Sequence, residues 1–204
     1  MDGPHVGIGR CVGLEGQARP FESQCCWVRP GSRKLIVTGG IGDDRSGDET
    51  LRQLGETAFL TLSSHIEVVK DKFRALTDSN VDLLKTGHDV HMHLVWEAYG
   101  GVKHGSYQAS MAASLLSLMI QRRPRDDTAI LGALTCTGRL SAANLEVDVV
   151  ALCSAQGIRR VTVAEEQGFE QDVLDQAAVV KEDGEPLLRF IRHTFVWDAV
   201  LDLF

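Results

Sequence analysis

Strand-like and helical patterns alternate along the chain, and this alternation constrains the fold most. Within residues 48–75, leucine, alanine and isoleucine recur at spacings of three and four, which predicts a helix with one buried face. Shorter apolar or alternating runs predict strands. The interleaving predicts an α/β (α+β) fold in which short mixed sheets pack with helices. We expect strands at 6–13, 22–29, 33–38, 89–95, 128–136 and 160–164, helices at 48–75, 107–121, 141–155 and 170–178, and a strand followed by a helix over 187–204.

Size and charge exclude several functional classes. The 204 residues correspond to one domain, residues 1–204. A formal net charge of −7 argues against a nucleic-acid surface and against an electrostatic membrane anchor. No apolar run has the length of a membrane span, and the first residues lack the features of a secretory signal. We therefore expect an intracellular protein, cytoplasmic or organellar, that is not secreted.

The cysteines are spaced for neither a metal site nor a disulfide framework. Their number is odd, and no two of them have the C-x-x-C spacing. We expect reduced thiols that are mostly packed in the core. The five are Cys11, Cys25, Cys26, Cys136 and Cys153.

Several short stretches resemble the proteolytic domain of Lon proteases, in the family's order and spacing. The resemblance extends over about 6–204 and implies the Lon proteolytic-domain fold. The stretches that carry it are Val-Gly-Ile-Gly-Arg-Cys-Val-Gly at 6–13, Leu-Ile-Val-Thr-Gly-Gly-Ile-Gly-Asp at 35–43, His-Asp-Val-His-Met-His-Leu at 88–94, Gly-Ile-Arg-Arg-Val at 157–161 and Trp-Asp-Ala-Val-Leu at 197–201.

At the positions that correspond to the Lon active site, the sequence differs more from the family's motifs. The resemblance places Ser106 on the catalytic nucleophile, but Lys103-His104-Gly105-Ser106-Tyr107-Gln108 stands where the family has Asp-Gly-Pro-Ser-Ala-Gly. Leu131 and Ala133 replace a threonine and an acid. Val147 occupies the position of the lysine of the Ser/Lys dyad. No lysine occurs between Lys103 and Lys181.

With the lysine missing, three functions have to be weighed against one another. A serine hydroxyl needs a base within hydrogen-bond reach, and valine cannot accept a proton. We therefore expect a catalytically impaired Lon-type peptidase, a pseudoprotease kept for assembly or partner binding. The first alternative is an active serine endopeptidase in which His104 or Lys103 replaces the lost base. The second is a binding module that shares only the architecture of Lon. A simpler role for Ser106 is the N-cap of helix 107–121.

The resemblance also implies partners. Lon proteolytic domains form rings, so we expect a homo-oligomer. The P-loop pattern Gly-x-x-x-x-Gly-Lys-Ser/Thr is absent, so an upstream or separate AAA+ ATPase would supply that function. If the chain is active, its substrate is a polypeptide. We predict no cofactor and no metal, because His91 and His93, which share one strand face, have counterparts without a metal role in Lon domains.

Overall fold

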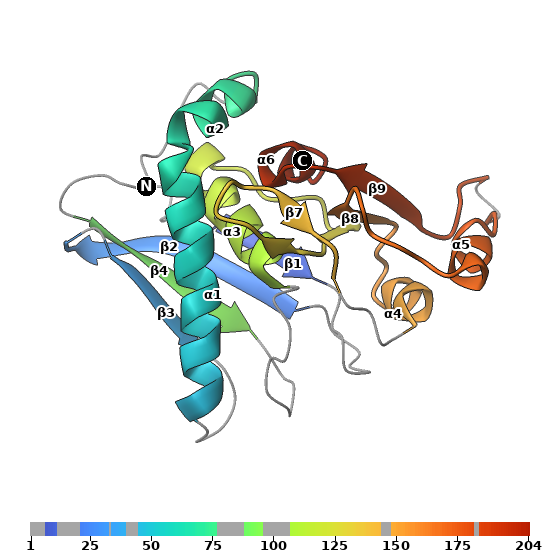
Figure 1. The fold of residues 1–204 in the computed structure, drawn as a ribbon, viewed down its shortest axis with the longest axis horizontal. Coiled ribbons are helices and arrows are strands. Elements are labelled where there is room, and N and C mark those ends of the chain that lie inside the picture. Colours follow the sequence, from blue (N-terminus) through green and yellow to red (C-terminus); the bar gives the residue numbers. More distant parts are fainter. Residues whose placement is uncertain are drawn as a thin grey trace.

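Six helices and nine strands are interspersed along the described part of the computed structural model, which confirms the predicted α/β (α+β) class (Figure 1). The structure describes residues 7–11, 21–32, 34–39, 45–76, 88–95, 107–143, 148–181 and 184–204. The strands are β1 (Gly7–Cys11), β2 (Phe21–Pro30), β3 (Leu35–Gly39), β4 (His88–Val95), β5 (Thr128–Ile130), β6 (Ala133–Leu134), β7 (Leu140–Ser141), β8 (Arg160–Ala164) and β9 (Arg189–His193). The helices are α1 (Arg45–Ser64), α2 (Ile66–Phe73), α3 (Gln108–Ile120), α4 (Val149–Ala155), α5 (Gln171–Ala177) and α6 (Val196–Leu201).

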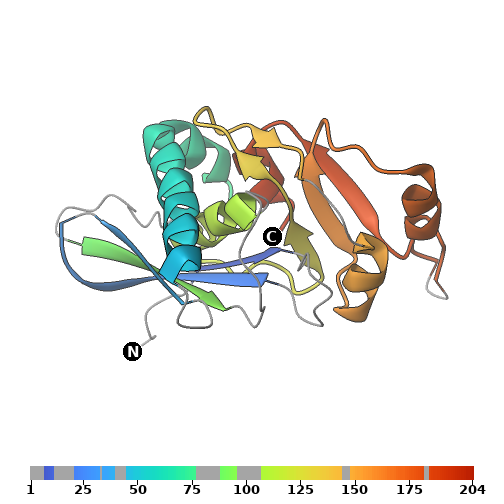
Figure 2. The same ribbon diagram turned by 60° about the horizontal axis from the view of Figure 1, so that its bottom comes forward.

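The larger sheet has four strands in the order β1-β2-β4-β3. β1 and β4 pair with β2 in antiparallel fashion, whereas β3 and β4 are parallel, so the sheet is mixed. Helices α1 and α3 pack on one face of it, as Figure 2 shows. Gly55 allows the close approach of α1, because a Cβ there would lie 3.0 Å from Cγ2 of Val37 and 3.5 Å from Sδ of Met92.

The second half of the chain forms two smaller sheets. β5, β8 and β9 make a parallel sheet in that order, and β6 and β7 form an antiparallel pair. Parallel neighbours need a crossover connection, which usually contains a helix. Here α4 lies in the connection from β7 to β8, and α5 lies in the connection from β8 to β9.

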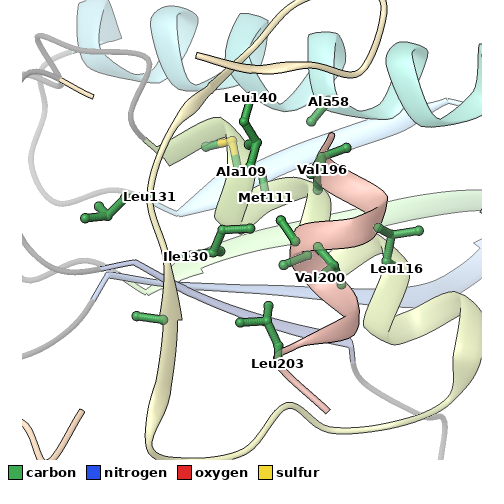
Figure 3. Packing of buried hydrophobic residues seen from close by; sticks show 14 of the residues in the cluster. Ala58, Ala109, Met111, Leu116, Ile130, Leu131, Leu140, Val196, Val200 and Leu203 are labelled. Atoms are coloured by element: carbon green, nitrogen blue, oxygen red, sulfur yellow. The ribbon is translucent and has the colours of Figure 1, made fainter. Parts of the chain in front are cut away.

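Helix α3 is the centre of the hydrophobic core. All of its residues are buried, including three serines. The helix packs against β1, β2 and α1 on one side and against β5, β6 and α6 on the other. Burial all round is what an apolar helix without a polar face requires. Labelled members of this core in Figure 3 are Ala58, Ala109, Met111, Leu116, Ile130, Leu131, Leu140, Val196, Val200 and Leu203.

Strand β1 lies directly against α3. The backbone N–H of Ile8 donates to Ser117 Oγ at 3.0 Å. A Cβ on Gly9 would lie 1.8 Å from the carbonyl oxygen of Ser110, far inside van der Waals contact. Glycine is therefore needed at this point because strand and helix approach backbone to backbone.

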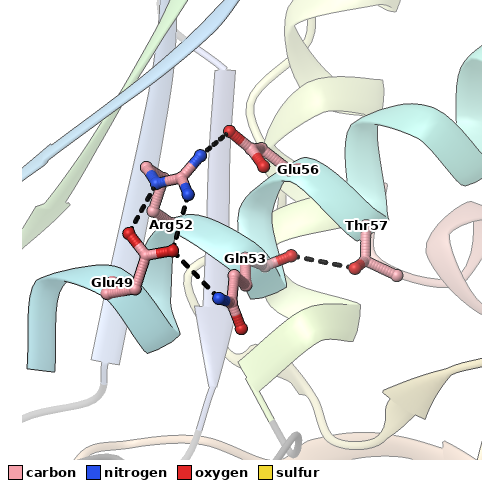
Figure 4. Close-up of polar contacts among 5 residues, drawn as sticks. All are labelled: Glu49, Arg52, Gln53, Glu56 and Thr57. Atoms are coloured by element: carbon pink, nitrogen blue, oxygen red, sulfur yellow. Dashed lines mark hydrogen bonds and ion pairs between the residues drawn. The ribbon is translucent and has the colours of Figure 1, made fainter. Parts of the chain in front are cut away.

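The solvent face of α1 carries a small network of charged side chains (Figure 4). Arg52 donates to Glu49 through Nε at 2.9 Å and Nη2 at 2.6 Å, and it also pairs with Glu56. Gln53 donates to Glu49 at 2.9 Å. The bonds from Arg52, then from Gln53, lower the pKa of Glu49 to about 2. These i,i+3 and i,i+4 contacts support the helix on the face away from the core.

None of the described helices combines the length and the apolar character that crossing a membrane requires.

Three predicted elements differ from the observed ones. The predicted helix 48–75 is two helices, because the chain turns at His65, whose Nδ1 lies 2.9 Å from the Thr61 carbonyl. The predicted strand 128–136 is interrupted at Gly132, whose φ of +147° removes it from the extended ladder. The predicted helix 141–155 does not begin at Ser141, which pairs in β7; α4 begins at Val149, after its N-cap Asp148.

Candidate functional site

The four residues predicted to decide catalysis lie outside the described residues. They are the nucleophile-position Ser106, the two alternative bases Lys103 and His104, and Val147 at the dyad-lysine position. The structure does describe the segments beside them: Tyr107 and α3 follow Ser106, while 141–143 and Asp148 flank 144–147. The elements that hold these flanking residues form the described surroundings of the candidate site.

The beginning of α3 is tied to the strand pair β6–β7. The side-chain Oε1 of Gln108 accepts a hydrogen bond from the Leu134 N–H at 2.9 Å. The next residue, Ala109, donates its N–H to the Gly132 carbonyl at 3.1 Å. The N-cap position of α3 falls on Tyr107, which makes no side-chain cap. Ser106 itself lies outside the described residues, so its role as an N-cap stays a prediction.

A second buried glutamine holds the chain before 144–147. Gln167 accepts a hydrogen bond from the Ala143 N–H at 2.7 Å and donates to the Ala143 carbonyl at 3.2 Å. On the other side, Asp148 Oδ1 accepts from the Ala151 N–H at 2.9 Å and caps α4. A buried backbone group without a partner costs free energy, so these side chains fix the local path of the main chain.

Sequence reasoning missed the role of both glutamines. Each is buried, with 7% of Gln108 and 5% of Gln167 exposed, although glutamine usually lies at the surface. Their partners are 26 and 24 residues away, and no pattern in the sequence links them. The only local signal is that Gln108 stands where the Lon motif has a small residue.

The structure describes two further positions that the resemblance assigns to the Lon active-site motif. Leu131 is 1% exposed, and its N–H donates to the Thr162 carbonyl at 2.9 Å. Ala133 is half-buried in β6. The hydroxyl and the carboxylate that the resemblance implies here are replaced by apolar groups, one of them in the core. Neither side chain can donate, accept or transfer a proton.

The serines that follow along α3 are packing residues. Ser110 Oγ donates to the Tyr107 carbonyl at 2.8 Å, and Ser114 Oγ donates to the Met111 carbonyl at 2.7 Å. Both side chains are fully buried. Such bonds to the preceding turn satisfy a hydroxyl inside a helix.

The two strand histidines differ in exposure. His91 is half-buried and His93 is exposed, and His93 Nδ1 lies 3.4 Å from Thr38 Oγ1. Across the described ranges, no group of three or more histidine, cysteine, aspartate or glutamate side chains is arranged to hold a metal ion.

Two of the cysteines have described side chains, and both are free thiols. Cys136 is exposed, whereas Cys153 is buried in α4. Burial raises the pKa of the Cys153 thiol to about 12. Because the thiolate is the reactive form, Cys153 is not a nucleophile at neutral pH.

Comparison with known proteins gives one informative similarity. No protein-family model matches the chain. The chain is 31% identical over 150 residues, or 72% of its length, to a Lon protease of Phenylobacterium zucineum (strain HLK1). It spans 17% of the length of that relative. The similarity supports a Lon-like relationship, and the mixed α/β architecture with short sheets is consistent with the fold of a Lon proteolytic domain.

Proposed function

We propose that the chain is a Lon-type peptidase domain that is catalytically impaired and serves assembly or partner binding. The observation that carries the proposal is the absence of lysine between Lys103 and Lys181, with Val147 at the dyad position. The similarity to a Lon protease supports a Lon-like peptidase domain, and the impairment is inferred from the residues of this chain.

Loss of the lysine removes the base that the reaction needs. In a Ser/Lys dyad, a lysine whose pKa is lowered by its surroundings takes the proton of the serine hydroxyl. General-base assistance of this kind contributes about 10²–10⁴-fold to the rate. Without it, backbone N–H groups near a helix start can still stabilise an oxyanion, but the attacking hydroxyl stays protonated.

The surroundings of the site support impairment rather than a rebuilt proton relay. Leu131 is buried and Ala133 has no polar atoms on its side chain, so neither can assist a proton transfer. By contrast, buried side chains support the main chain beside the site: Gln108 is bonded to β6, and Gln167 is bonded to Ala143. A well-supported framework with apolar side chains at these two positions is consistent with the proposed impairment.

Peptidase assays on three forms of the protein test the proposal. Short fluorogenic peptides are suitable substrates because they do not require unfolding by an ATPase. We expect equal background rates from the parent and from Ser106→Ala, with both folded by circular dichroism. We expect Val147→Lys to gain labelling by a serine-directed fluorophosphonate, because it supplies the missing base.

Cleavage by the parent that disappears in Ser106→Ala would overturn the impairment. The active serine endopeptidase would then be correct, and His104→Ala and Lys103→Ala would identify its base. A parent that is inactive, together with an unreactive Val147→Lys, would instead favour a binding module that shares only the Lon architecture.

Assembly is the second part of the proposal. A Lon-like ring of identical chains and an AAA+ ATPase, upstream or on a separate chain, are the proposed partners. Light scattering coupled to size-exclusion chromatography measures the mass of the particle directly. We expect a closed oligomer whose mass is a multiple of 22.3 kDa. A particle of 22.3 kDa at high concentration would exclude self-assembly of this chain.

A further inference from the structure

Strand β9 forms an edge of the parallel sheet. The sheet has the order β5-β8-β9, so β8 pairs with one side of β9, and no described strand pairs with the other side (Figure 1). That outer side is occupied just before the strand, where the Leu188 N–H donates to the Ala177 carbonyl at 3.1 Å. Along β9 itself, the described part of the chain provides no backbone partner there. An unpaired edge of this kind is a template for another strand.

The backbone groups on the outer side of β9 belong to Phe190 and Arg192. The N–H of Arg189 donates to the Arg159 carbonyl at 2.9 Å, and the His193 carbonyl accepts at 2.9 Å from the N–H of the first residue after β8. Both ends of the strand therefore bond towards β8. Because the backbone groups of successive residues point to opposite sides of a strand, those of Phe190 and Arg192 point outwards.

The side chains of Phe190 and Arg192 already share an aromatic contact. Phe190 stacks on Phe169 with ring centroids 4.0 Å apart, and the Arg192 guanidinium carbon lies 5.7 Å from the centre of the same ring. Both side chains therefore project from one face of β9. A guanidinium group is attracted to the face of an aromatic ring, so phenylalanine and arginine are compatible neighbours across two paired strands.

We propose that β9 pairs in antiparallel fashion with β9 of a second copy of this chain. A two-fold axis at Ile191 places Phe190 opposite the partner's Arg192, and the same pair recurs on the other side of the axis. In each pair the two residues exchange both of their N–H···O bonds. The edge is thus complementary to itself in backbone and in side chains. The chain bends at Thr194, so the added strand ends before it would reach Ala177.

The charges on the opposite face of β9 do not prevent this pairing. Charged side chains often protect an exposed edge from other strands. Here each has an intramolecular partner: Arg189 pairs with Glu185, and His193 Nε2 lies 2.5 Å from Asp202 Oδ2. The proposed register sets Arg189 opposite the partner's His193, with a carboxylate beside each. Repulsion between the two basic groups is therefore offset.

The proposal goes beyond the assembly proposed above and does not rest on it. A ring joins its copies head to tail, whereas a strand that pairs with itself across a two-fold axis joins them in twos. A strand of five residues buries little surface, so the association should be weak. It should therefore appear as a rise of the mean mass with protein concentration.

Sedimentation analysis of three forms of the protein tests the pairing. Arg192→Pro removes the outward N–H, a change that an edge strand tolerates because no bond to β8 is lost. Arg192→Ala is the matched control, because it removes the same side chain and keeps the N–H. We expect Arg192→Ala to associate more weakly than the parent, and Arg192→Pro about tenfold more weakly than Arg192→Ala, because the axis removes the bond twice. Circular dichroism confirms that both variants are folded.

A cysteine at the proposed axis tests the register. In the antiparallel pair, residue 191 faces its own copy at a Cα separation of about 4.5 Å, which is within the range of a disulfide. We expect Ile191→Cys to give a dimer linked through residue 191 of both copies under mild oxidation. Arg189→Cys is the control, because it lies two residues from the axis and should not link to itself. Peptide mapping by mass spectrometry identifies the linked residues. If Arg192→Pro does not fold, this pair of variants decides the question alone.

Three results would overturn the inference. A parent that stays monomeric at the highest concentration would leave the edge to a different polypeptide. Equal association of Arg192→Pro and Arg192→Ala would place the contact between copies elsewhere. The same conclusion would follow if Ile191→Cys formed no disulfide between its two copies of residue 191. Peptidase activity of the parent would disprove the proposed impairment without changing any of these results, so the two failures are distinguishable.

Discussion

Gln167 binds the backbone of Ala143 at both of its polar groups: it accepts from the N–H at 2.7 Å and donates to the carbonyl at 3.2 Å. The same amide also donates to the Gly168 carbonyl at 3.1 Å. One side chain therefore joins the turn after β8 to the segment that precedes residues 144–147. Because it is 5% exposed, water cannot easily replace these bonds.

Replacement of Gln167 by leucine should destabilise the domain. The substitution leaves the Ala143 N–H and carbonyl buried without a partner, which costs about 1–3 kcal/mol per group. Urea denaturation of Gln167→Leu and of the parent measures the difference. Gln176→Leu, at an exposed position in α5, is the control and should change the free energy of unfolding by less than about 0.5 kcal/mol. Equal effects of the two variants would mean that the bonds to Ala143 contribute nothing.

Gly9→Ala should be strongly destabilising. The new Cβ would lie 1.8 Å from the Ser110 carbonyl oxygen and 2.9 Å from the Ser114 nitrogen, so β1 or α3 has to move. Overpacking of this kind costs about 1–3 kcal/mol, and more where backbone is displaced. Gly168→Ala is the matched control, because nothing lies within 4 Å of its added Cβ. Thermal unfolding of the pair checks the prediction, and a Gly9→Ala melting temperature equal to that of the control would contradict it.

Asp89 should make stability depend on pH in the acid range. The N–H of Lys34, then that of Ser32, donate to its carboxylate at 2.9 and 2.8 Å and hold its pKa below the ordinary value of 3.8. A carboxyl group whose pKa is lower in the folded state stabilises the fold above the unfolded pKa. That contribution is lost as the pH falls from 3.8 through the folded pKa.

The measurement is a series of denaturation curves for the parent and for Asp89→Asn between neutral pH and strong acid. We expect the parent to be more stable at neutral pH and the difference to shrink below the ordinary pKa of the carboxyl group. A difference that is constant across the series would show that Asp89 does not titrate with folding.

The two described thiols should react at very different rates. Cys136 is exposed, whereas Cys153 is buried and its pKa is about 12. At neutral pH we expect a maleimide to modify Cys136 in the native protein and Cys153 only after unfolding. Peptide mapping by mass spectrometry distinguishes the two sites. Rapid native labelling of Cys153 would mean that α4 opens without global unfolding.

Local patterns predicted most elements because periodicity reflects which face is buried. The short strand at 160–164 and the helix at 107–121 were predicted within one residue of their observed bounds. The errors occur where a single residue interrupts a good pattern. At His65 the ring lies tilted against that of Trp197, at a centroid distance of 5.4 Å, and the chain turns there although the apolar spacing continues to Ile66.

The candidate site was less accessible to prediction. Local resemblance could propose Ser106 and Val147 for the nucleophile and dyad-lysine positions, but the residues that support the neighbouring chain act over long sequence distances. Gln108 reaches Leu134, and Gln167 reaches Ala143, through side-chain bonds to backbone that no hydrophobic pattern encodes. Such contacts exist only once the sheets and helices have assembled.

Complete burial of α3 has a consequence for how this chain can change during evolution. Each residue from Gln108 to Ile120 is enclosed by other elements, so most substitutions there would reduce the folded population. Selection for a folded domain alone is enough to keep this helix, whether or not the preceding serine ever attacks a substrate. Conservation of the helix in distant relatives would therefore show that the fold is maintained, and it would not by itself show that the domain is active. Selection for activity would instead conserve the polar residues around the helix. Those residues can be substituted once catalysis is no longer required.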